Sequence, residues 1–520
     1  MAASADLLSL CRAAAERGGD DPFLQVGDRV RSARQIAAEV AAVAAGLVAA
    51  GLQPGDRVVV LLPRCVDEVV VLLAVAAAAG VAVPLHGKLK DAQVAHVLGD
   101  CEPFAVVTSA VRLLGLSDPR VLLAGHRVFR VDAELRGLDA TPLPRLQSAA
   151  TLPAPPTSAP AVMLYTSGST GLAKGIVQDH RNLCLGAAIV AGYLGLQRTD
   201  HILALLPTSF DYGLNQVLSA LHAGCRVTAA DHLGSGELAT LLRTHRPTGL
   251  AGVPSLWHEV AAGLALGTLQ PDDGASLRYV TNSGGALRVA DAAVLRRQWP
   301  HVQVFAMYGL TEAFRSAFLP PDEFDQAPES FGRALPGVEL LLVDPATGAV
   351  LHGEATGELV HAGALVALGY WRRPEAQAQR FRPDPRGTGA TVVFSGDLVR
   401  RDAAGRHYFV ARADRLLKVA GHRISPDEVA AAVAGQPGVG EVAVFGVPGG
   451  PDGHRVVLCV AGDPHDATLR ERLVRRCRAR LPSYMQPAAV HVLPALPHNS
   501  NGKVDENVLR TLVPPCTDAP

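Results

Sequence analysis

The sequence predicts an α/β protein with a large, multilayered N-terminal domain rich in parallel strands and a small α+β domain toward its C-terminal end. Three observations support this prediction. The chain has 520 residues, which exceeds the usual size of one compact core. Ala- and Val-rich helical stretches alternate with short apolar segments through the first part of the chain. Beyond residue 411 this alternation gives way to a basic turn that is followed by helices and short strands.

The N-terminal part consists of repeated strand–helix–strand units. We expect helix, strand, helix and strand in turn at residues 37–51, 57–62, 68–79 and 81–85. This order favours parallel strands with helices packed on them. The longest apolar run, Val69 to Leu85, is broken by Gly80 and Pro84. It falls short of the ~20 residues that span a bilayer, so it predicts a buried helix followed by a strand and no membrane insertion.

An irregular connection and a strand come next. Residues 141–160 are rich in Pro, Ala, Thr and Ser, which is typical of an irregular surface segment. The apolar residues 161–165 then predict a strand that leads directly into a glycine-rich loop at residues 166–175.

The C-terminal part predicts a separate unit of about a hundred residues, a usual size for an independent domain. After the basic turn at residues 412–423 we expect a helix at 426–434 and strands at 442–447 and 456–460. Thr468 and Glu471 are spaced as a capping box at the start of another helix. Apolar residues recur in that helix at every fourth position, so one of its faces should pack on a small sheet: Leu469, Leu473, Cys477 and Leu481.

Composition excludes several classes of function. The chain has 48 Lys and Arg against 49 Asp and Glu, so no overall charge favours nucleic acid or an acidic membrane. Its eight cysteines form no CxxC pair, which argues against a disulfide framework and against a structural zinc site. The first residues lack the pattern of a secretory signal. We therefore expect a cytoplasmic protein that neither binds nucleic acid nor inserts into membranes.

The loop at residues 166–175 has the composition of a phosphate-binding site. Glycines allow backbone amides to approach an anion closely, and hydroxyl groups and a lysine add donors. It is not a Walker loop, because GxxxxGK[ST] is absent. The alternative is a solvated Gly/Ser linker, which the lysine and the preceding strand argue against. The candidate phosphate-binding residues are Thr166, Ser167, Gly168, Ser169, Thr170, Gly171 and Lys174.

This segment resembles the phosphate-binding loop of the superfamily of AMP-forming acyl-CoA synthetases, amino-acid adenylation domains and luciferases. The usual residue before the lysine is proline; Ala173 takes its place here and changes loop stiffness without removing a ligand group. The resemblance implies an enzyme that uses ATP to activate a carboxylic acid as an acyl adenylate. It also implies that the loop binds the β- and γ-phosphates, which leave as pyrophosphate.

Two further motifs of that superfamily follow in the expected order. Residues 307–312 resemble its YGxTE motif, which implies that Tyr308 lies against adenine, with Gly309 next to it. In the same motif Thr311 would meet phosphate and Glu312 would help to hold Mg²⁺. A metal is needed because the substrate carboxylate and the triphosphate repel each other. Upstream, residues 283–286 resemble the turn beside adenine, which assigns nucleotide contacts to Gly284, Gly285 and Ala286.

The resemblance continues toward the C-terminal end. Asp397 matches the aspartate that accepts hydrogen bonds from the ribose hydroxyls, although a lone aspartate by default caps a turn. Arg412 matches an arginine that contacts the nucleotide, and Asp414 matches the hinge between domains. Arg423 belongs to a GHR-like turn whose Gly421 borders the thiol tunnel in the family. These matches imply a large domain at 1–411, a hinge at 412–414 and a small, mobile domain at 415–520.

Lys503 lies in residues 497–505, which resemble the motif whose lysine reaches the main active site during adenylation. A flexible ammonium suits this role because negative charge develops on the carboxylate, the α-phosphate and the leaving pyrophosphate. A solvated lysine is the alternative for an isolated Gly-Lys pair. The resemblance thus assigns catalysis to Lys503, Thr311, Glu312 and Arg423.

The segment that begins at Phe210 bears on which acid is activated. Many acyl-CoA synthetases have a histidine at the place of Phe210, whereas amino-acid adenylation domains carry Phe-Asp, whose aspartate binds the substrate ammonium. A buried Asp211 needs a partner, which an amino-acid substrate would supply. The alternative is a structural partner, and Tyr212 departs from the small residue usual at that position.

The resemblance also places five residues along the pocket wall: Tyr212, Asn215, Met307, Arg315 and Ser316. An arginine in the pocket would favour an acidic or strongly polar side chain, because it pairs with carboxylates in bidentate fashion. It could equally pair with Asp211 or Glu312 and be structural.

The acceptor of the activated acid is a thiol, either the phosphopantetheine arm of a carrier protein or coenzyme A. The helix that begins near Thr468 carries a dense basic cluster, which suits an acidic carrier protein but is also typical of a solvated face: Arg470, Arg472, Arg475, Arg476, Arg478 and Arg480. Three functions follow as hypotheses. They are a ligase that loads a small acid, with an amino acid preferred, onto a carrier protein; an acyl-CoA synthetase for a fatty or aromatic acid; and a non-catalytic adenylate-binding protein, which the intact motifs argue against.

Overall fold

The computed structural model describes residues 5–132, 138–146, 152–166, 173–232, 234–412, 417–419, 422–448, 454–481, 485–499 and 502–513. The chain divides into two compact units, Met1–Leu341 with Val360–Phe394 and Leu342–Leu359 with Ser395–Pro520. Residues 395–411 thus group with the C-terminal unit. The predicted hinge at 412–414 stays a prediction, because residues 413 and 414 lie outside the described part.

The first sheet of the N-terminal unit has the strand order β20-β9-β8-β4-β3-β5-β6-β7. The strands from β8 to β7 run parallel, and β9 and β20 are added antiparallel. Their bounds are β3 Arg57–Leu61, β4 Val81–Pro84, β5 Ala105–Thr108, β6 Val128–Arg130, β7 Thr141–Pro142, β8 Pro160–Thr166, β9 Lys174–Asp179 and β20 Gly369–Tyr370.

The second sheet has the order β16-β15-β14-β13-β12-β10-β11-β1-β2 within this unit. Its central strands, from β14 to β1, are parallel. The bounds are β1 Pro22–Val26, β2 Arg29–Ser32, β10 His201–Ala204, β11 Arg226–Ala229, β12 Gly249–Gly252, β13 Tyr279–Asn282, β14 Gln303–Leu310, β15 Ala313–Leu319 and β16 Ser330–Ala334.

Helices form layers on both faces of these sheets. The helices are α1 Leu7–Gly18, α2 Ala33–Ala49, α3 Val66–Ala77, α4 Asp91–Cys101, α5 Ala110–Leu113, α6 Pro119–Leu122, α7 His180–Tyr193, α8 Asp211–Ala223, α9 Ser235–His245, α10 Pro254–Leu266, the 3₁₀ turn Pro271–Gly274, α11 Val289–Gln298 and α12 Pro374–Arg380, with the short strand β21 at Phe381–Pro383. The strand–helix–strand order predicted for residues 37–85 is confirmed by α2, β3, α3 and β4.

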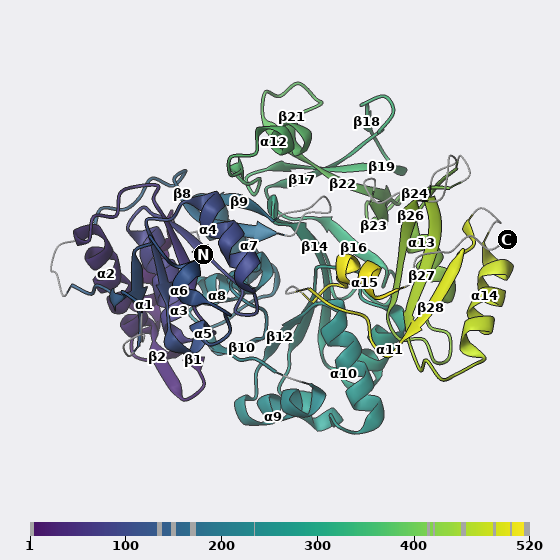
Figure 1. Cartoon of the computed structure of the whole chain (residues 1–520), viewed down its shortest axis with the longest axis horizontal. Helices are drawn as coiled ribbons and strands as arrows, with labels where there is room; N and C mark the ends of the chain where they lie inside the picture. The colour runs from purple at the N-terminus through teal and green to yellow at the C-terminus, as the bar shows by residue number, and fades with distance from the viewer. Residues whose placement is uncertain are drawn as a thin grey trace. The chain divides into compact units, whose positions relative to one another are not determined.

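The layers follow from alternation along the strands. In β3, Val58 and Val60 face a core shared with α1, α2, α3, α7 and α8, while Val59 and Leu61 face a core shared with α4. That first core also includes residues of β10 and β11, so α3 is buried all round between the two sheets. Helices α9, α10 and α11 lie on the far face of the second sheet (Figure 1). They share a core there that includes Trp257 and Trp299.

The C-terminal unit contains a small sheet with the order β26-β27-β28. Its elements include β24 Leu417–Val419, β25 His422–Ile424, α13 Pro426–Val433, β26 Val442–Pro448, β27 His454–Ala461, α14 Leu469–Arg480, β28 Ala489–Leu493 and α15 Glu506–Leu512. Leu458 of β27 packs with α13 and α14, whereas Cys459 packs with α15 on the opposite face. The predicted helices and strands of this unit are confirmed. The predicted apolar face of α14 is buried.

The capping box predicted at Thr468 and Glu471 is wrong. Thr468 has helical backbone angles and makes no side-chain cap, so its hydroxyl is not in position to accept from the third residue of the helix. Asp466 caps α14 instead, because its Oδ1 accepts from the amides of Thr468 at 3.0 Å and Leu469 at 3.1 Å. A carboxylate at a helix N-terminus also interacts favourably with the helix dipole.

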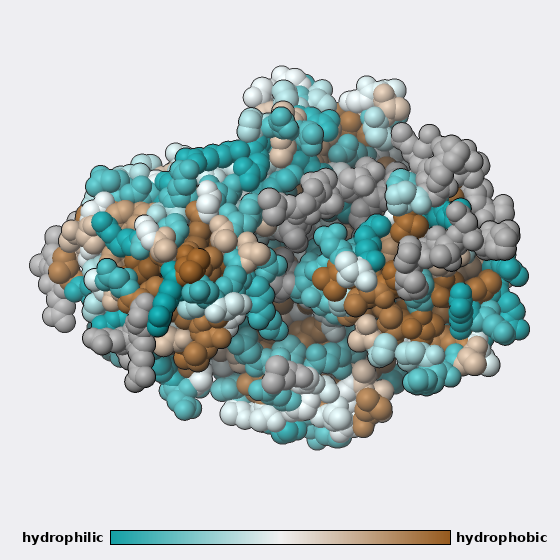
Figure 2. Space-filling view, viewed as in Figure 1, coloured by the Kyte–Doolittle hydropathy of each residue, from teal (hydrophilic) through white to brown (hydrophobic). Residues whose placement is uncertain are grey.

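Three strands run from one unit into the other, β17 Val338–Val343, β19 Ala355–Gly363 and β22 Thr391–Arg401, whereas β18 Val350–Leu351 and β23 His407–Arg412 belong to the C-terminal unit. Within the described part of the chain, no helix combines the length and the apolar content that crossing a membrane requires. Hydrophilic side chains cover much of the face seen in Figure 2. Hydrophobic side chains gather there over the N-terminal helices and over the strands β27 and β28.

Candidate functional site

The candidate phosphate loop connects two antiparallel strands. Tyr165 of β8 pairs with Gly175 of β9, and Thr166 pairs with Lys174. The loop therefore joins the ends of a hairpin, and Lys174 begins the returning strand. The predicted loop residues 167–171 lie outside the described part, so the structure places only Thr166 and Lys174 of this set.

Helix α4 holds both ends of this loop. His96 Nε2 lies 2.8 Å from the carbonyl oxygen of Ala173, where it acts as the donor. One turn later, Asp100 Oδ2 accepts a hydrogen bond from the Tyr165 hydroxyl at 2.7 Å. Burial and this carboxylate both raise the pKa of Tyr165, which therefore remains a neutral donor. Asp100 also pairs with Arg373, in the segment that follows β20. We call these contacts of His96 and Asp100 the clamp of the loop.

We expect His96→Ala to raise the KM for ATP about 3- to 10-fold with little change in kcat, because one hydrogen bond contributes about 0.5–1.5 kcal/mol. The reason is that the C-terminal end of the loop, at Ala173, loses its hydrogen bond to His96. Initial rates at varied ATP measure this, with the exposed His352→Ala as the control. Adding Ala173→Pro to this variant should bring the KM for ATP back toward the wild-type value, since proline fixes φ at the residue whose carbonyl His96 holds. An unchanged KM in His96→Ala would contradict the clamp.

Lys174 and Glu312, which are far apart in sequence, meet at Tyr370. The Lys174 ammonium lies 5.6 Å from the centroid of the Tyr370 ring, and the Tyr370 hydroxyl donates to Glu312 Oε1 at 2.5 Å. Pairing of β20 with β9 sets this position, since Tyr370 lies opposite Ile176. Sequence reasoning missed Tyr370. The only local signal was an aromatic pair with Trp371, and nothing in it points to a carboxylate 58 residues earlier.

The turn after β13 contains the glycines that were predicted to lie beside adenine. Gly284 has φ 82°, a left-handed conformation that favours glycine. A Cβ on Gly285 would lie 3.0 Å from Pro254 Cγ, and the Gly285 carbonyl accepts from Asn282 Nδ2 at 2.9 Å. Asn282 is 3% exposed, and its Oδ1 has no partner among the described residues. This buried acceptor fits an exocyclic amine such as that of adenine. Ala286 follows and is exposed.

Tyr308 and its neighbours lie at the end of β14. The Tyr308 ring stacks on Phe331 with centroids 4.4 Å apart, and it is parallel to His361 at 5.8 Å. Gly309 continues the strand, and Thr311 is buried, with its carbonyl accepting from Gln178 Nε2. Glu312 therefore lies close to the β8–β9 hairpin that carries the candidate phosphate loop. A carboxylate in this position is the kind of oxygen ligand that Mg²⁺ takes, so the residues present fit a metal-bound nucleotide.

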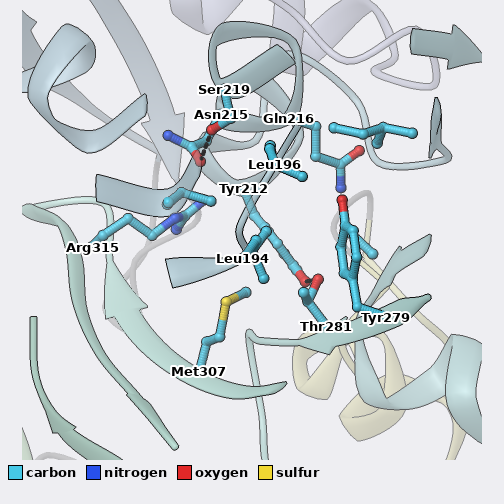
Figure 3. Close-up of a pocket in the computed structure, with 13 residues that line it drawn as sticks. Leu194, Leu196, Tyr212, Asn215, Gln216, Ser219, Tyr279, Thr281, Met307 and Arg315 are labelled. Atoms are coloured by element: carbon cyan, nitrogen blue, oxygen red, sulfur yellow. Dashed lines mark hydrogen bonds between the residues drawn. The ribbon is translucent and has the colours of Figure 1, made fainter. Parts of the chain in front are cut away.

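A small cavity lies between α7, α8, β14 and β15 (Figure 3). Its volume is about 20 Å³, which is room for about one water molecule. Four of the predicted pocket residues line it, Tyr212, Asn215, Met307 and Arg315. The other lining residues were not predicted: Val190, Leu194, Leu196, Ile202, Gln216, Ser219, Ala251, Tyr279 and Thr281.

Arg315, which lines the cavity, forms a buried ion pair with Asp211, which does not. Arg315 Nη1 lies 3.1 Å from Asp211 Oδ2, Nη2 donates to the Asp211 carbonyl at 3.2 Å, and each side chain is 4% exposed. Arg315 also lies over the ring of Tyr212 at 5.1 Å. Of the alternatives open for this arginine, pairing with Asp211 is the one observed. The structural partner that the sequence left open as the alternative for Asp211 is therefore present.

Other side chains of the pocket are fixed by hydrogen bonds. The Tyr212 hydroxyl bonds to Thr281 Oγ1, and the Tyr193 hydroxyl donates to Met307 Sδ at 2.8 Å. Burial raises the pKa of Tyr212, which stays neutral. Three predicted residues, Phe210, Asp211 and Ser316, are not among those that line the cavity. Ser316 Oγ donates to the Ala313 carbonyl at 3.2 Å. Phe210 precedes α8 as its N-cap residue, with its ring edge-on to Tyr212.

The loop before Phe210 is supported by α3. Thr208 Oγ1 donates to Glu68 Oε1, and Arg64 donates to the carbonyls of Ala204 and Leu205, both at 2.9 Å. Glu68 is buried, and burial raises its pKa from 4.5 to about 7. The first turn of α3 thus positions the segment that carries Asp211.

We expect the free energy of unfolding to fall as pH rises from about 4.5 to about 7, because the folded protein retains a proton on Glu68 that the unfolded chain releases. The contribution amounts to at most about 3 kcal/mol at one to one and a half kcal/mol per pKa unit. Glu68→Gln should remove this part of the pH dependence. Denaturant titrations between pH 4 and 8 measure it, with the exposed Glu375→Gln as control. An unchanged profile in Glu68→Gln would contradict the assignment.

Asp397 and Arg412 lie opposite each other in the C-terminal unit. They are register partners in the β22–β23 pair, and Arg412 Nε lies 3.6 Å from Asp397 Oδ1. Asp397 is buried within β22, so the alternative that it caps a turn is wrong. Ser395 Oγ accepts a hydrogen bond from the Asp397 amide at 3.0 Å and donates one to the Leu359 carbonyl at 2.6 Å. The structure thus brings together the two residues predicted to contact ribose and nucleotide.

Lys503 is exposed in a short loop that is closed by backbone contacts. Its carbonyl accepts from the Asn499 amide at 2.7 Å, and its own amide donates to Asn499 Oδ1 at 3.1 Å. His498 Nε2 anchors the loop to Glu441 at 2.9 Å. Asp414, Gly421 and the Arg423 side chain lie outside the described residues, so their predicted roles stay predictions.

Comparisons with known proteins agree with this arrangement. Residues 11–371 match the model of the AMP-binding enzyme family, and residues 428–503 match the AMP-binding enzyme C-terminal domain. The L-proline--[L-prolyl-carrier protein] ligase of Streptomyces coelicolor is 30% identical over 94% of this chain and 93% of its own length. The probable non-canonical nonribosomal peptide synthetase CymA of Salinispora arenicola is 32% identical over 89% of this chain, which spans only 6% of that protein.

A solved structure is similar along nearly the whole chain. The crystal structure of ATP-bound MatB from Rhodopseudomonas palustris superposes with a TM-score of 0.84, at 26% identity and with 98% of each chain covered. This supports the α/β assignment with a large N-terminal and a small C-terminal domain. Because the family model matches more than half of the residues, the chain belongs to the AMP-binding enzyme family and is an adenylate-forming ligase.

Proposed function

We propose that this ligase adenylates a small carboxylic acid with an amino group and then transfers the acyl group to the phosphopantetheine thiol of a carrier protein. The observation that carries this proposal is the buried Asp211 at the pocket end of α8, preceded by Phe210. An aspartate there is suited to a substrate ammonium. The similarity to a carrier-protein ligase along both full chains adds support for this choice of substrate and acceptor.

The proposed reaction has two steps. An oxygen of the substrate carboxylate attacks the α-phosphorus of ATP, and the bond from that phosphorus to the β-phosphate oxygen breaks, so pyrophosphate leaves. The thiolate sulfur of the acceptor then attacks the acyl carbon, and AMP leaves with the electrons of the carbon–oxygen bond. When bound, Mg²⁺ would offset the charge of the triphosphate and lower its repulsion of the carboxylate.

Residues of this chain have distinct roles in the proposal. Thr166 and Lys174 hold the phosphates that leave, and Glu312, oriented by Tyr370, provides the oxygen ligand for the metal. Asn282 and the Gly284–Gly285 turn receive adenine, and Asp397 with Arg412 receives the ribose and phosphate. Lys503 stabilises charge at the reacting centre, and the predicted hinge at 412–414 lets the small domain alternate between the two steps.

A second candidate is an acyl-CoA synthetase for an acid that lacks an amino group. The ion pair between Asp211 and Arg315 favours it, because the aspartate already has a cationic partner. ATP–pyrophosphate exchange separates the two candidates, since it needs no acceptor. Exchange with amino acids supports the first proposal. Exchange confined to acids without an amino group contradicts it and leaves the second, and no exchange with any acid contradicts both.

The acceptor is tested on α14. Arg470, Arg475 and Arg478 are exposed on this helix, whereas Arg472 and Arg476 are held by Asp466 and the Ala432 carbonyl. We expect the triple charge reversal Arg470→Glu, Arg475→Glu and Arg478→Glu to raise the KM for an acidic carrier protein at least ~10-fold at low salt, because a rim of like charge repels it.

Pyrophosphate exchange should stay unchanged in this variant, and the exposed Arg120→Glu serves as the matched control. Added salt should reduce the difference between the variant and the wild type. An unchanged KM for the carrier would show that the arginines form only a solvated face.

A further inference from the structure

Arg315 lines the cavity, and its charge is neutralised by Asp211, a buried carboxylate that is not itself among the lining residues. Asp211 and Arg315 are each 4% exposed and lie 3.1 Å apart. Removing the charge of either residue destabilises the folded protein, because the other charge then stays buried with neither water nor an ion-pair partner. Any substrate that enters this pocket must therefore preserve the balance of charge around the pair.

Four kinds of acid substrate differ in the net charge that they would add to the pocket. The carboxylate that reacts is common to all four and is left out of this count. An amino acid with a neutral side chain adds one positive charge, so the ammonium and Arg315 compete for Asp211. A dicarboxylic acid without an amino group adds one negative charge, which competes with Asp211 for Arg315. Only two kinds add none: an acid with neither group, and an acid with both an amino group and a second carboxylate.

Buried amide groups distinguish these last two kinds. Asn215 is 2% exposed, and its Oδ1 accepts from Ser219 Oγ at 3.0 Å, whereas its Nδ2 has no partner among the described residues. Gln216 is 6% exposed, and both of its amide atoms are likewise without a partner in that part of the chain. Both residues line the cavity, with Asn215 on the same side as Arg315 (Figure 3). A purely apolar substrate would leave these groups unsatisfied, which disfavours it.

Building on the proposed function, we infer that the pocket takes an α-amino acid with a second carboxylate on a short side chain. The ammonium binds Asp211, and the side-chain carboxylate binds Arg315 and Asn215 Nδ2, so that one ion pair becomes two. The cavity is about 20 Å³ and its wall includes Val190, Leu194 and Met307. Because this is room for only about one water molecule, Arg315 and the cavity wall must move to admit even a short side chain of one or two methylene groups.

The test is pyrophosphate exchange with acids matched in length. Aspartate carries both groups, asparagine only the ammonium, succinate only the second carboxylate, and butyrate neither. Glutamate, glutamine, glutarate and pentanoate repeat the design with one more methylene. We expect kcat/KM for aspartate or glutamate to exceed that of its three length-matched analogues at least ~50-fold.

Each other outcome has a defined meaning. Preference for asparagine, glutamine or an apolar amino acid overturns the inference and leaves the amino-acid function intact. Preference for succinate or glutarate overturns the ammonium site and with it the amino-acid function. Preference for butyrate, pentanoate or another monocarboxylic acid overturns both and leaves the acyl-CoA synthetase. No exchange with any acid overturns the proposed function itself.

Two variants test the residues separately. Arg315→Gln should shift the preference from aspartate toward asparagine at least ~10-fold, because an amide can pair with an amide but not balance a carboxylate. Asn215→Ala retains the ion pair and should raise the KM for the acidic substrate about 5-fold while leaving the KM for ATP unchanged. Equal losses for all acids in Asn215→Ala would indicate a purely structural role and would count against the inference.

Discussion

Replacing Lys503 by Ala lowers the rate of pyrophosphate exchange by about 10²–10³-fold, which is the usual effect of removing one donor from a developing oxyanion. The family resemblance places this ammonium at the reacting carboxylate and the α-phosphate during the first step. Thioester formation from supplied acyl adenylate should stay near the wild-type rate, because pyrophosphate has already left. The two half-reactions are measured separately, by exchange and by single-turnover transfer.

The side chain of Lys503 is well suited to this test. Its loop is closed by backbone bonds with Asn499 and by His498 on Glu441, and these survive truncation of an exposed lysine. A fall in exchange therefore reports chemistry and not unfolding. Lys88→Ala, which removes another exposed lysine, is the matched control. Equal loss of both half-reactions in Lys503→Ala would contradict the two-step assignment.

Replacing Arg315 by Met destabilises the N-terminal unit by about 3–5 kcal/mol, since it leaves Asp211 buried without its observed counter-charge. Asp211→Asn combined with Arg315→Met should recover much of this loss, because no uncompensated charge remains. The comparison is a double-mutant cycle measured by chemical denaturation with a probe of the N-terminal unit.

An exposed pair supplies the control for this cycle. Arg296 and Asp325 lie 2.6 Å apart, with side chains 33% and 60% exposed. Truncation of Arg296 should change stability by less than about 1 kcal/mol, as is usual for exposed pairs. If Arg315→Met behaves like Arg296→Met, the pair contributes little to folding, and the charge argument for substrate choice loses its basis.

Two regions of the fold show how far secondary structure could be predicted from the sequence. The order of α2, β3, α3 and β4 follows from apolar spacing and from Gly and Pro positions, which act over a few residues. The apolar face of α14 was predicted for the same reason. Its N-terminus was not, because the sequence offers both Thr468 and Asp466 as capping side chains and only the backbone conformation selects between them.

Chemistry carried by short motifs was equally accessible. The strand, the glycine-rich loop and Lys174 are adjacent in the chain, so their placement on one hairpin could be predicted. Tyr212 and Asn215 could be assigned to a pocket through the family resemblance, and both line the cavity from α8. Tyr370 could not, because its contact with Glu312 depends on the pairing of β20 with β9.

The sequence by itself therefore determined the class of enzyme, because the residues predicted to bear its chemistry reside in local motifs. Only the tertiary structure decided which of those residues act on one another. Arg315 meets Asp211 across 104 positions because the fold brings a side chain of β15 to the first residue of α8. Local pattern carries no information about such a distant pairing, and the charge balance that it creates is what bears on substrate choice.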